Sequence, residues 1–411
     1  MKIAIIGAGV CGVISLKYAK ESGHECDVFE QTGELGGIWV YSDEYGMDKN
    51  GMPSYRNMYK GLVTNAPKEV MTFLDFQYRT DVKDSYITQK QTLEYIHDFV
   101  KKFDLERHIQ YYTRVKRVEP NDDQWTVTVV DDKTKTERQA RYDAVFVCNG
   151  QYFMPHMPEI EGQNLFRGLQ MHSRDYRSTE LYENKQVLII GGSSSAVDIS
   201  QKIAAVAKNV YISHWSTILL KVVDVTVKPS VKQLYNKGAV FSDGTKEDFD
   251  IIIYCTGYKR FYPFLTKECG ITVEDNWVRY LYKHIINIEN PTLCFIGVPT
   301  FIPTFIISDL QARFALAALD GKFSLPSKEE MLKEITENVT ELRSKNVPQR
   351  HFHKIFLGFR KYTTDLCKVS GIRPFPEVIT NLYEHLLTTI GTLQTTTKYV
   401  LVDDEKFIEI K

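Results

Sequence analysis

The sequence predicts an α/β fold with two dinucleotide-binding units of the Rossmann type, the second inserted into the first. Glycine-rich loops begin at Gly7 and at Gly191, and each follows a short apolar run typical of a buried strand. Proline-containing segments at 154–158 and at Asn290-Pro291 bracket the second loop. We therefore expect a first unit over residues 1–158, a second over 159–291, and a return to the first over 292–411.

The composition is that of a globular protein long enough for two domains. The chain has 411 residues, of which 43% are apolar and 25% charged, and its formal net charge is −1. This charge gives no electrostatic reason to expect nucleic acid or an anionic membrane as a partner. No apolar run approaches the roughly 20 residues that span a bilayer, and a strand begins directly after Met1. We expect a cytoplasmic protein, unless a signal peptide was removed before Met1.

The residues that usually signal other kinds of chemistry are not arranged for it. The seven cysteines include no C-x-x-C pair, so we expect reduced thiols and no redox disulfide of the kind that many two-dinucleotide reductases need. No Ser-His-Asp set, no pair of catalytic carboxylates and no His/Cys cluster with metal-ligand spacing is evident. We expect no metal site, and the chemistry would come from bound cofactors.

Hydrophobic periodicity places the main elements of both units. A helix begins near Thr92, with apolar residues at helical spacing, and another follows Pro326, where Ser327-x-x-Glu330 forms a capping box. The other elements follow from short apolar runs that end in glycine or polar turns. The expected strands are 2–6, 26–30, 186–190, 250–254 and 293–296; the expected helices include 10–22 and 92–103; a hairpin region is expected over 112–147.

The first loop is an unbroken G-x-G-x-x-G formed by Gly7, Gly9 and Gly12. In such a loop the first glycine allows a tight turn, the second lets the backbone approach a pyrophosphate, and the third lets helix and strand pack closely. Glu30 ends the next strand, where a carboxylate binds ribose hydroxyls and repels a 2′-phosphate. The first site therefore favours FAD or NAD over NADP.

The second loop departs from this pattern. Ser193 takes the place of the middle glycine after Gly191, and two more serines, Ser194 and Ser195, follow it. At the ribose position the second unit has Ser213 and His214 in place of an acidic residue. Without a carboxylate to repel the 2′-phosphate, this site permits NADPH. The arginine that usually binds the 2′-phosphate is missing. An alternative is that His214 only packs beside Trp215.

Four motifs give the chain a family resemblance. Residues 166–176 have the form F-x-G-x-x-x-H-x-x-x-Y, and residues 255–258 read Cys-Thr-Gly-Tyr. Residues 36–39 read Gly-Gly-Ile-Trp, and residues 59–71 read YKGLVTNAPKEVM. Together with the first loop, they make nearly the whole chain resemble the flavin-dependent monooxygenases that carry FAD and NADPH. The resemblance implies the two-unit fold in which the NADP unit is inserted into the FAD unit.

Tyr176 narrows the resemblance further. The related Baeyer–Villiger monooxygenases carry tryptophan at this position, so tyrosine points to the branch that oxygenates nitrogen and sulfur. Within that branch, the amino-acid sequence around Asn65 and the hydrophilic C-terminus resemble those of short insect members. These members include pyrrolizidine-alkaloid (senecionine) N-oxygenases. The implied function is N-oxygenation of tertiary amines such as plant alkaloids, as a means of detoxification.

The resemblance also implies a mechanism and its residues. NADPH would reduce FAD, O₂ would give a C4a-hydroperoxyflavin, and its distal oxygen would pass to an amine or sulfide while the protein excludes water. Asn65 is expected to be the catalytic side chain, as an amide donor; the alternative is a turn-capping asparagine before Pro67. The expected FAD contacts are Gly7, Gly9, Gly12, Glu30, Gln31, Gly37, Trp39, Thr64, Asn65, Val115 and Gln311. The expected NADP contacts are Arg174, Tyr176, Gly191, Ser193, Ser194, Ser195, Ser213, His214 and Thr256.

Other functions remain open at this stage. They are a general oxygenase of sulfur and nitrogen in xenobiotics, a Baeyer–Villiger enzyme acting on ketones, a two-dinucleotide reductase, and a non-enzymatic NADP sensor. Tyr176 disfavours the second, and the missing C-x-x-C pair disfavours the third. Expected partners are a small amine substrate and O₂, and a homo-oligomer is possible.

Overall fold

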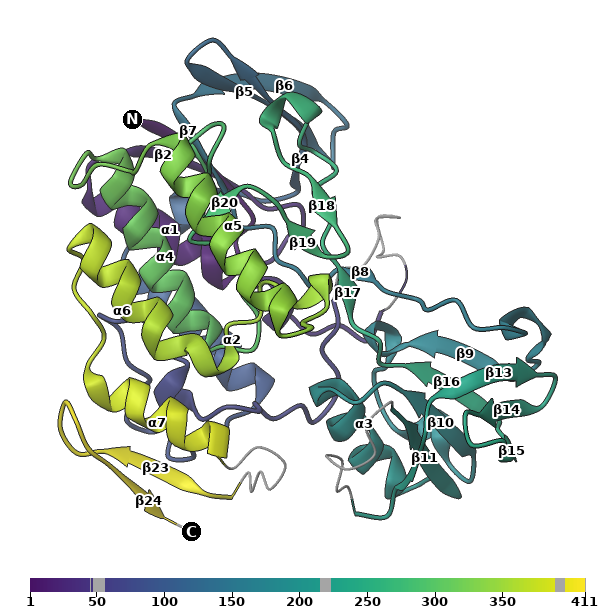
Figure 1. The fold of residues 1–411 in the computed structure, drawn as a ribbon. Helices are drawn as coiled ribbons and strands as arrows, with labels where there is room; N and C mark the ends of the chain where they lie inside the picture. Colours follow the sequence, from purple (N-terminus) through teal and green to yellow (C-terminus); the bar gives the residue numbers. More distant parts are fainter. Residues whose placement is uncertain (45, 47–55, 215–222, 389–395, 411) are drawn as a thin grey trace.

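The computed structural model describes residues 1–44, 46, 56–214, 223–388 and 396–410. Figure 1 shows a larger unit, which contains both chain termini, beside a smaller unit built around a second sheet. This is the predicted α/β architecture of two units, with the second inserted into the first.

A seven-stranded sheet forms the centre of the larger unit. Its five parallel strands lie in the order β22-β7-β1-β2-β3, and β21 and β20 extend it antiparallel beyond β22. The strands are β1 Lys2–Ile6, β2 Glu25–Phe29, β3 Ile109–Gln110, β7 Ala144–Val147, β20 Leu281–Tyr282, β21 Ile286–Asn287 and β22 Leu293–Phe295. The glycine loop therefore leaves the carboxyl edge of the sheet, where parallel α/β sheets bind ligands.

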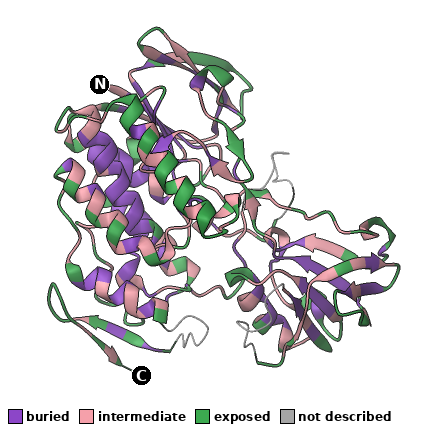
Figure 2. Cartoon of the chain, viewed as in Figure 1, coloured by how far each residue is buried: buried purple, intermediate pink, exposed green. Residues whose placement is uncertain are grey.

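Alternation along β1 explains how this sheet is covered. Ile3 and Ile5 pack into the core shared with the helices, whereas Ala4 and Ile6 pack against a three-stranded antiparallel sheet on the other face. The helices α1 and α4 are almost wholly buried, as Figure 2 shows. The helices are α1 Val10–Glu21, α2 Gln89–Lys102, α4 Thr304–Leu319, α5 Lys328–Ser344, α6 Phe359–Ser370 and α7 Glu377–Thr388; the antiparallel strands are β4 Thr113–Asn121, β5 Gln124–Asp131 and β6 Glu137–Tyr142.

Local sequence signals account for the helix starts. The predicted capping box of Ser327 and Glu330 is present, with both reciprocal hydrogen bonds. Thr88 and Gln91 form a second capping box, so α2 begins at Gln89, three residues before the predicted start. The predicted hairpin region contains β4 to β6, but its last run, β7, belongs to the parallel sheet.

The smaller unit has a five-stranded parallel sheet in the order β12-β11-β10-β16-β9. The helix α3 begins directly after its glycine loop, and a three-stranded antiparallel sheet packs beside it. The elements are β9 Leu169–His172, β10 Gln186–Ile190, α3 Ser194–Ala204, β11 Asn209–Ser213, β12 Thr226–Lys228, β13 Val231–Tyr235, β14 Gly238–Phe241, β15 Lys246–Asp248 and β16 Ile251–Tyr254.

The two chain crossings between the units lie side by side. Strand β8, Met154–Pro155, pairs antiparallel with β17, Tyr258–Lys259. The chain past β17 rejoins the larger unit well before the predicted boundary at residue 291, because β20 and β21 belong to its sheet and residues such as Phe264 lie in its core. We therefore propose that the second boundary lies near β17; a first boundary near 158 remains in keeping with the linker at β8.

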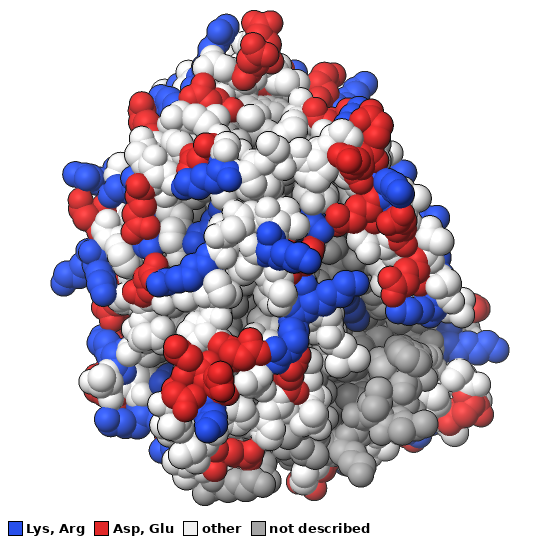
Figure 3. Space-filling model, turned by 60° about the vertical axis from the view of Figure 1, so that its left-hand side comes forward, with Lys and Arg blue, Asp and Glu red and all other residues white. Residues whose placement is uncertain are grey.

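The remaining elements are short. They are β18 Val273–Glu274, β19 Trp277–Val278, a C-terminal hairpin of β23 Lys398–Leu401 and β24 Phe407–Ile410, and the 3-10 turns η1 Gly37–Trp39, η2 Lys68–Val70, η3 Glu106–His108, η4 Gln163–Leu165, η5 Ser173–Asp175, η6 Glu180–Tyr182, η7 Lys267–Cys269, η8 Gln349–His351 and η9 Phe356–Gly358. Across the described ranges, no helix has the length and apolarity needed to cross a membrane. Figure 3 shows acidic and basic side chains intermixed over the visible face.

Candidate cofactor-binding and active site

The first glycine loop has the geometry of a phosphate cradle. Gly7 has φ of +103°, and a Cβ there would lie 2.7 Å from the carbonyl oxygen of Cys148. A Cβ on Gly12 would lie 1.9 Å from the carbonyl oxygen of Gly7. Both positions thus require glycine for steric reasons, and Gly12 is what lets α1 approach the end of β1.

Gly37 closes over the same loop. Its φ is +58°, and a Cβ there would lie 3.0 Å from the Cα of Gly9. The helix α1 begins after Gly9 with no side chain capping its first backbone N–H groups. These N–H groups and the positive end of the helix dipole suit a pyrophosphate. The cradle therefore fits a dinucleotide, and a side chain at Gly9 or Gly37 would fill it.

Glu30 is buried at the end of β2, as its predicted role requires. Its carboxylate accepts hydrogen bonds from the backbone N–H of Ala8 at 2.9 Å and from the N–H and hydroxyl of Thr32, each at 2.8 Å. Burial raises the pKa of Glu30 above its usual value, and these donors oppose that rise. The carboxylate is thereby fixed at the edge of the loop, with lone pairs left for ribose hydroxyls.

Asn65 is exposed and follows a buried Thr64. Within the described part of the chain, the Asn65 side-chain amide makes no hydrogen bond, so the turn-capping alternative has no contact to support it. The hydroxyl of Thr64 accepts a hydrogen bond from the N–H of Ile87 at 3.1 Å, which fixes the segment. The amide of Asn65 is thus positioned by its backbone and free to donate.

The other expected flavin contacts fall into two groups. Trp39 and Gln31 are half-buried, and Val115 is buried on β4 beside the sheet. Gln311 is fully buried, and its amide is already used: its oxygen accepts from the N–H of Gly297 at 2.8 Å, and its nitrogen donates to the hydroxyl of Tyr362 at 2.7 Å. We therefore correct the prediction for the Gln311 side chain, which fastens α4 to the carboxyl end of β22.

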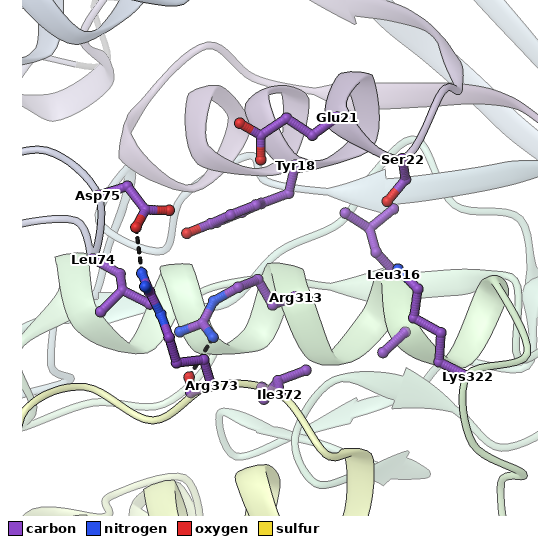
Figure 4. A pocket seen from close by; sticks show the side chains of 11 residues that line it. Tyr18, Glu21, Ser22, Leu74, Asp75, Arg313, Leu316, Lys322, Ile372 and Arg373 are labelled. Atoms are coloured by element: carbon purple, nitrogen blue, oxygen red, sulfur yellow. Dashed lines mark hydrogen bonds and ion pairs between the residues drawn. The ribbon is translucent and has the colours of Figure 1, made fainter.

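A cavity of about 450 Å³ lies at the far end of α1, next to Tyr18 and Arg313 (Figure 4). Beneath it, the buried carboxylate of Asp309 accepts hydrogen bonds from the hydroxyl of Tyr18 and the N–H of Leu74, both at 3.0 Å, and from Arg313 at 2.7 Å. Because α1 points its other end at the glycine loop, this cavity is separate from the cofactor cradle. The Asp309 cluster holds α1 and α4 together.

The second glycine loop also has the shape of a dinucleotide site. A Cβ on Gly191 would lie 2.2 Å from the carbonyl oxygen of Cys255, and one on Gly192 would lie 2.4 Å from the ring of His214. The ring of His214 therefore lies over the loop. The three serines that follow are exposed at the start of α3, which has no side-chain cap. These residues are Ser193, Ser194 and Ser195.

Ser213 does not face this site. Its side chain is buried, its hydroxyl donates to the carbonyl of Pro229 at 2.8 Å, and it accepts from the N–H of Val231 at 3.0 Å. The prediction that Ser213 binds a 2′-phosphate is therefore corrected, because both roles of the hydroxyl are filled inside the unit. Lys228, at the end of the neighbouring strand β12, was not among the predicted contacts. The N–H of His214 donates to the backbone carbonyl of Lys228 at 3.2 Å.

Residues 166–176 run from the core of the smaller unit, through strand β9, to the junction of the two units. Tyr176 is 1% exposed, and its ring centroid lies 5.0 Å from that of Tyr59 in the larger unit. The ring of Tyr176 packs the junction, and its direct contact with NADP stays a prediction. Arg174 remains a candidate, since its guanidinium is partly accessible and is held to the linker by the carbonyl of Phe153 at 3.3 Å. The hydroxyl of Thr256 donates to the carbonyl of His156 and so ties the crossings together.

His172 links the same two crossings. Its Nε2 bonds to the carbonyl of Gly257 at 3.0 Å, and its Nδ1 accepts from the N–H of Arg174 at 3.1 Å. These partners define a neutral ring with the proton on Nε2. Burial lowers the pKa of His172 to about 4.

We expect His172 to make the protein less stable in acid. An unfolded histidine titrates near 6.5, and the buried ring near 4. Between those values the unfolded chain binds a proton that the folded chain does not. The contribution of His172 to the free energy of unfolding is therefore full above about pH 6.5. It is lost as the pH falls, by roughly 3 kcal/mol in total. Urea unfolding at several pH values measures this. His172→Gln should show a dependence on pH weaker by about one proton, and equal dependences would contradict the assignment.

Arg177 is a junction residue that the sequence reading missed. Its buried guanidinium donates to the carbonyl oxygens of Ser42, Glu44 and Arg56 in the larger unit, and to those of Arg174 and Tyr176 in the linking segment. No motif marks it, apart from its place directly after Tyr176. Arg177 thus fastens Ser42, Glu44 and Arg56 to the junction.

Known proteins with similar sequences agree with this geometry. The family model described as flavin-binding monooxygenase-like matches residues 1–224 and 216–388. The chain belongs to this family. It is 32% identical to a senecionine N-oxygenase of Tyria jacobaeae over 93% of this chain and 85% of that one. It is 33% identical to the flavin-containing monooxygenase FMO GS-OX-like 4 of Arabidopsis thaliana over 90% of this chain and 87% of that one.

Solved structures of flavin monooxygenases have the same fold as this chain. The S-allyl-L-cysteine S-oxygenase of Allium sativum superposes with a TM-score of 0.88 at 32% identity, covering 94% of this chain and 92% of that one. Tmm of Pelagibacter sp. strain HTCC7211 superposes with a TM-score of 0.87 at 28% identity, covering 97% and 94%. A cyclohexanone monooxygenase shares the fold alone, at 15% identity, a TM-score of 0.63, and 90% and 97% coverage. The chain is thus a flavin-dependent monooxygenase that uses FAD and NADPH, and its relatives include N- and S-oxygenases.

Proposed function

We propose that this monooxygenase oxygenates tertiary amine nitrogen, with plant alkaloids such as pyrrolizidine alkaloids as the substrate class. The similarity to a senecionine N-oxygenase along most of both chains is the observation that carries the proposal. S-oxygenation of thioethers is the second candidate, favoured by the similarity to an S-allyl-L-cysteine S-oxygenase. Both reactions give one oxygen atom to a soft lone pair.

The chain's own residues would bind and shield the cofactors. FAD, when bound, supplies the activation of O₂, and NADPH supplies the electrons. The backbone of the cradle around Gly9 and Gly37 would hold the FAD pyrophosphate, and Glu30 its ribose. The loop after Gly191 and the exposed serines would hold the NADPH pyrophosphate. Asn65 would donate its amide hydrogen beside the flavin ring, where charge develops during oxygen transfer.

His214 should help to set the choice of nicotinamide cofactor. Its ring lies over the second loop, and a carboxylate there would repel a 2′-phosphate. His214→Glu should therefore lower kcat/KM for NADPH by roughly tenfold or more while leaving that for NADH unchanged. His214→Gln, which adds no charge, is the matched control. Steady-state oxidation of both cofactors measures the effect, and an unchanged NADPH-to-NADH ratio in His214→Glu would remove His214 from this role.

The proposed reaction can be tested on the purified protein. The flavin-loaded protein is reduced with NADPH under anaerobic conditions and then mixed with O₂, with or without a tertiary amine. We expect an oxygenated flavin species that decays faster when the amine is present, together with the N-oxide by mass spectrometry. Turnover of a thioether but not of the amine would favour the second candidate. Failure to bind FAD would contradict both.

A further inference from the structure

Two residues with strained backbones, Phe301 and Phe356, contact each other beside the loop that follows β22. Phe301 has φ of +57° and Phe356 has φ of +39°, a region that side chains other than glycine rarely adopt. Their ring centroids lie 6.3 Å apart with an interplanar angle of 80°. Such strain persists where neighbouring contacts impose it, often at functional sites. Here the hydroxyl of Tyr383 donates to the carbonyl of Phe301 at 2.8 Å.

The loop that carries Phe301 starts and ends beside the candidate flavin site. It leaves β22 at Gly297, where a Cβ would lie 2.5 Å from the sulfur of Cys11 in the first turn of α1. It enters α4 next to Phe305, whose ring centroid lies 6.4 Å from that of Trp39. In the chain, Phe301 lies between these two contacts, and its side chain is 46% exposed.

A second segment places a lysine on this loop. The N–H of Thr300 donates to the carbonyl of His353 at 2.9 Å, and the N–H of Ile355 donates to the carbonyl of Thr300 at 3.3 Å. These bonds bring Lys354 over the ring of Phe301, with its ammonium nitrogen 4.2 Å from the ring centroid. The segment follows α5, which in Figure 1 runs toward the smaller unit.

The charge of Lys354 has no acidic partner among the described residues. Within the described ranges, no carboxylate lies within ion-pair distance of its ammonium group, which rests only on the Phe301 ring. Burial, and then the charge of Arg350, lower the pKa of Lys354. The neighbouring Leu357 is 78% exposed, so exposed apolar surface adjoins Lys354. An incoming anionic group would neutralise it, whereas an incoming ammonium would meet a like charge.

We propose that Lys354, seated on Phe301, selects substrates by charge at the entrance to the oxygenation site. It favours sulfides and amines that carry an anionic group, and it admits amines as the uncharged free base. This inference rests on the proposed function. The chemistry is consistent with it, because a protonated amine has no lone pair to accept oxygen and would occupy the site without reacting.

A panel of thioethers with one reacting sulfur and different charges tests the proposal. It contains 4-(methylthio)benzoate, neutral methyl p-tolyl sulfide and [4-(methylthio)phenyl]trimethylammonium. Each is assayed for kcat/KM with the wild type, Lys354→Met, Lys354→Glu and, as matched control, Lys361→Met, an exposed lysine on α6. Differences in sulfur reactivity cancel when each anion-to-cation ratio is compared between proteins. Binding of the same three compounds to the flavin-loaded protein, by calorimetry, gives a readout independent of turnover.

We expect the anion-to-cation ratio to fall by about tenfold or more in Lys354→Glu, and by less in Lys354→Met, both in turnover and in binding. The neutral sulfide and Lys361→Met should stay near wild type. A ratio in folded, flavin-loaded Lys354→Glu within about twofold of wild type in both assays would overturn the proposal. Absence of turnover of all three sulfides by the wild type would count against the proposed function instead, and the binding ratios would still decide the role of Lys354.

Discussion

Replacing Gly12 by alanine should abolish the holoenzyme. The new methyl group would lie 1.9 Å from the carbonyl oxygen of Gly7, a backbone atom that cannot turn aside. The start of α1 would have to move away from β1, which disrupts the pyrophosphate cradle and costs on the order of 3 kcal/mol or more of folding free energy. We expect the purified variant to contain little FAD, as measured by visible absorbance per protein, and to unfold at a lower temperature.

Gly358→Ala is the matched control. Its backbone is ordinary, and the nearest atom to a new Cβ, on Ile355, would lie 3.7 Å away. The control should bind FAD and unfold as the wild type does. Normal flavin content in Gly12→Ala would show that the cradle tolerates displacement of α1, and the structural account of the loop would then be wrong.

Asn65→Ala should retain FAD and NADPH oxidation but lose product. The exposed amide of Asn65 is the donor that we place where negative charge develops, and removal of one such donor typically costs about 10²-fold in rate. Electrons would then leave as hydrogen peroxide, so the yield of oxygenated product per NADPH should fall by at least tenfold. The measurement is product and peroxide per NADPH consumed.

A surface asparagine supplies the comparison for this experiment. Asn338 is exposed on α5, and Asn338→Ala should leave the product yield at the wild-type value. If Asn65→Ala couples NADPH to product as well as Asn338→Ala does, the catalytic role of Asn65 has to be given up. Flavin content measured in both variants separates this result from a loss of cofactor.

The sequence predicted what depends on short-range steric needs. The loops at Gly7 and Gly191 require glycine because the neighbouring carbonyl oxygens leave no room for a side chain, and that need is local and recognisable. The same holds for the capping box at Ser327. Strands β1 and β10, and the helix α1 that follows β1, therefore lie within a residue or two of their predicted bounds.

The sequence did not predict the role of a side chain where that role depends on a contact with a distant segment. Gln311 looked like a flavin contact, but Tyr362, far along the chain, takes its amide nitrogen. Ser213 looked like a phosphate ligand, but Pro229 and Val231 take its hydroxyl. The second boundary that we propose near β17 has no signal in the sequence, because β20 and β21 are too short to show any periodicity.

The bonding of Arg177 has a consequence for how this chain can vary. Its guanidinium donates to the backbone carbonyls of Ser42, Glu44 and Arg56, so any amino acid that leaves the backbone undistorted can accept these hydrogen bonds. Mutational scanning should therefore find tolerance at residues 42, 44 and 56 and intolerance at 177. Pairwise covariation between the two sides of the junction would be weak, although the junction itself is firmly fastened.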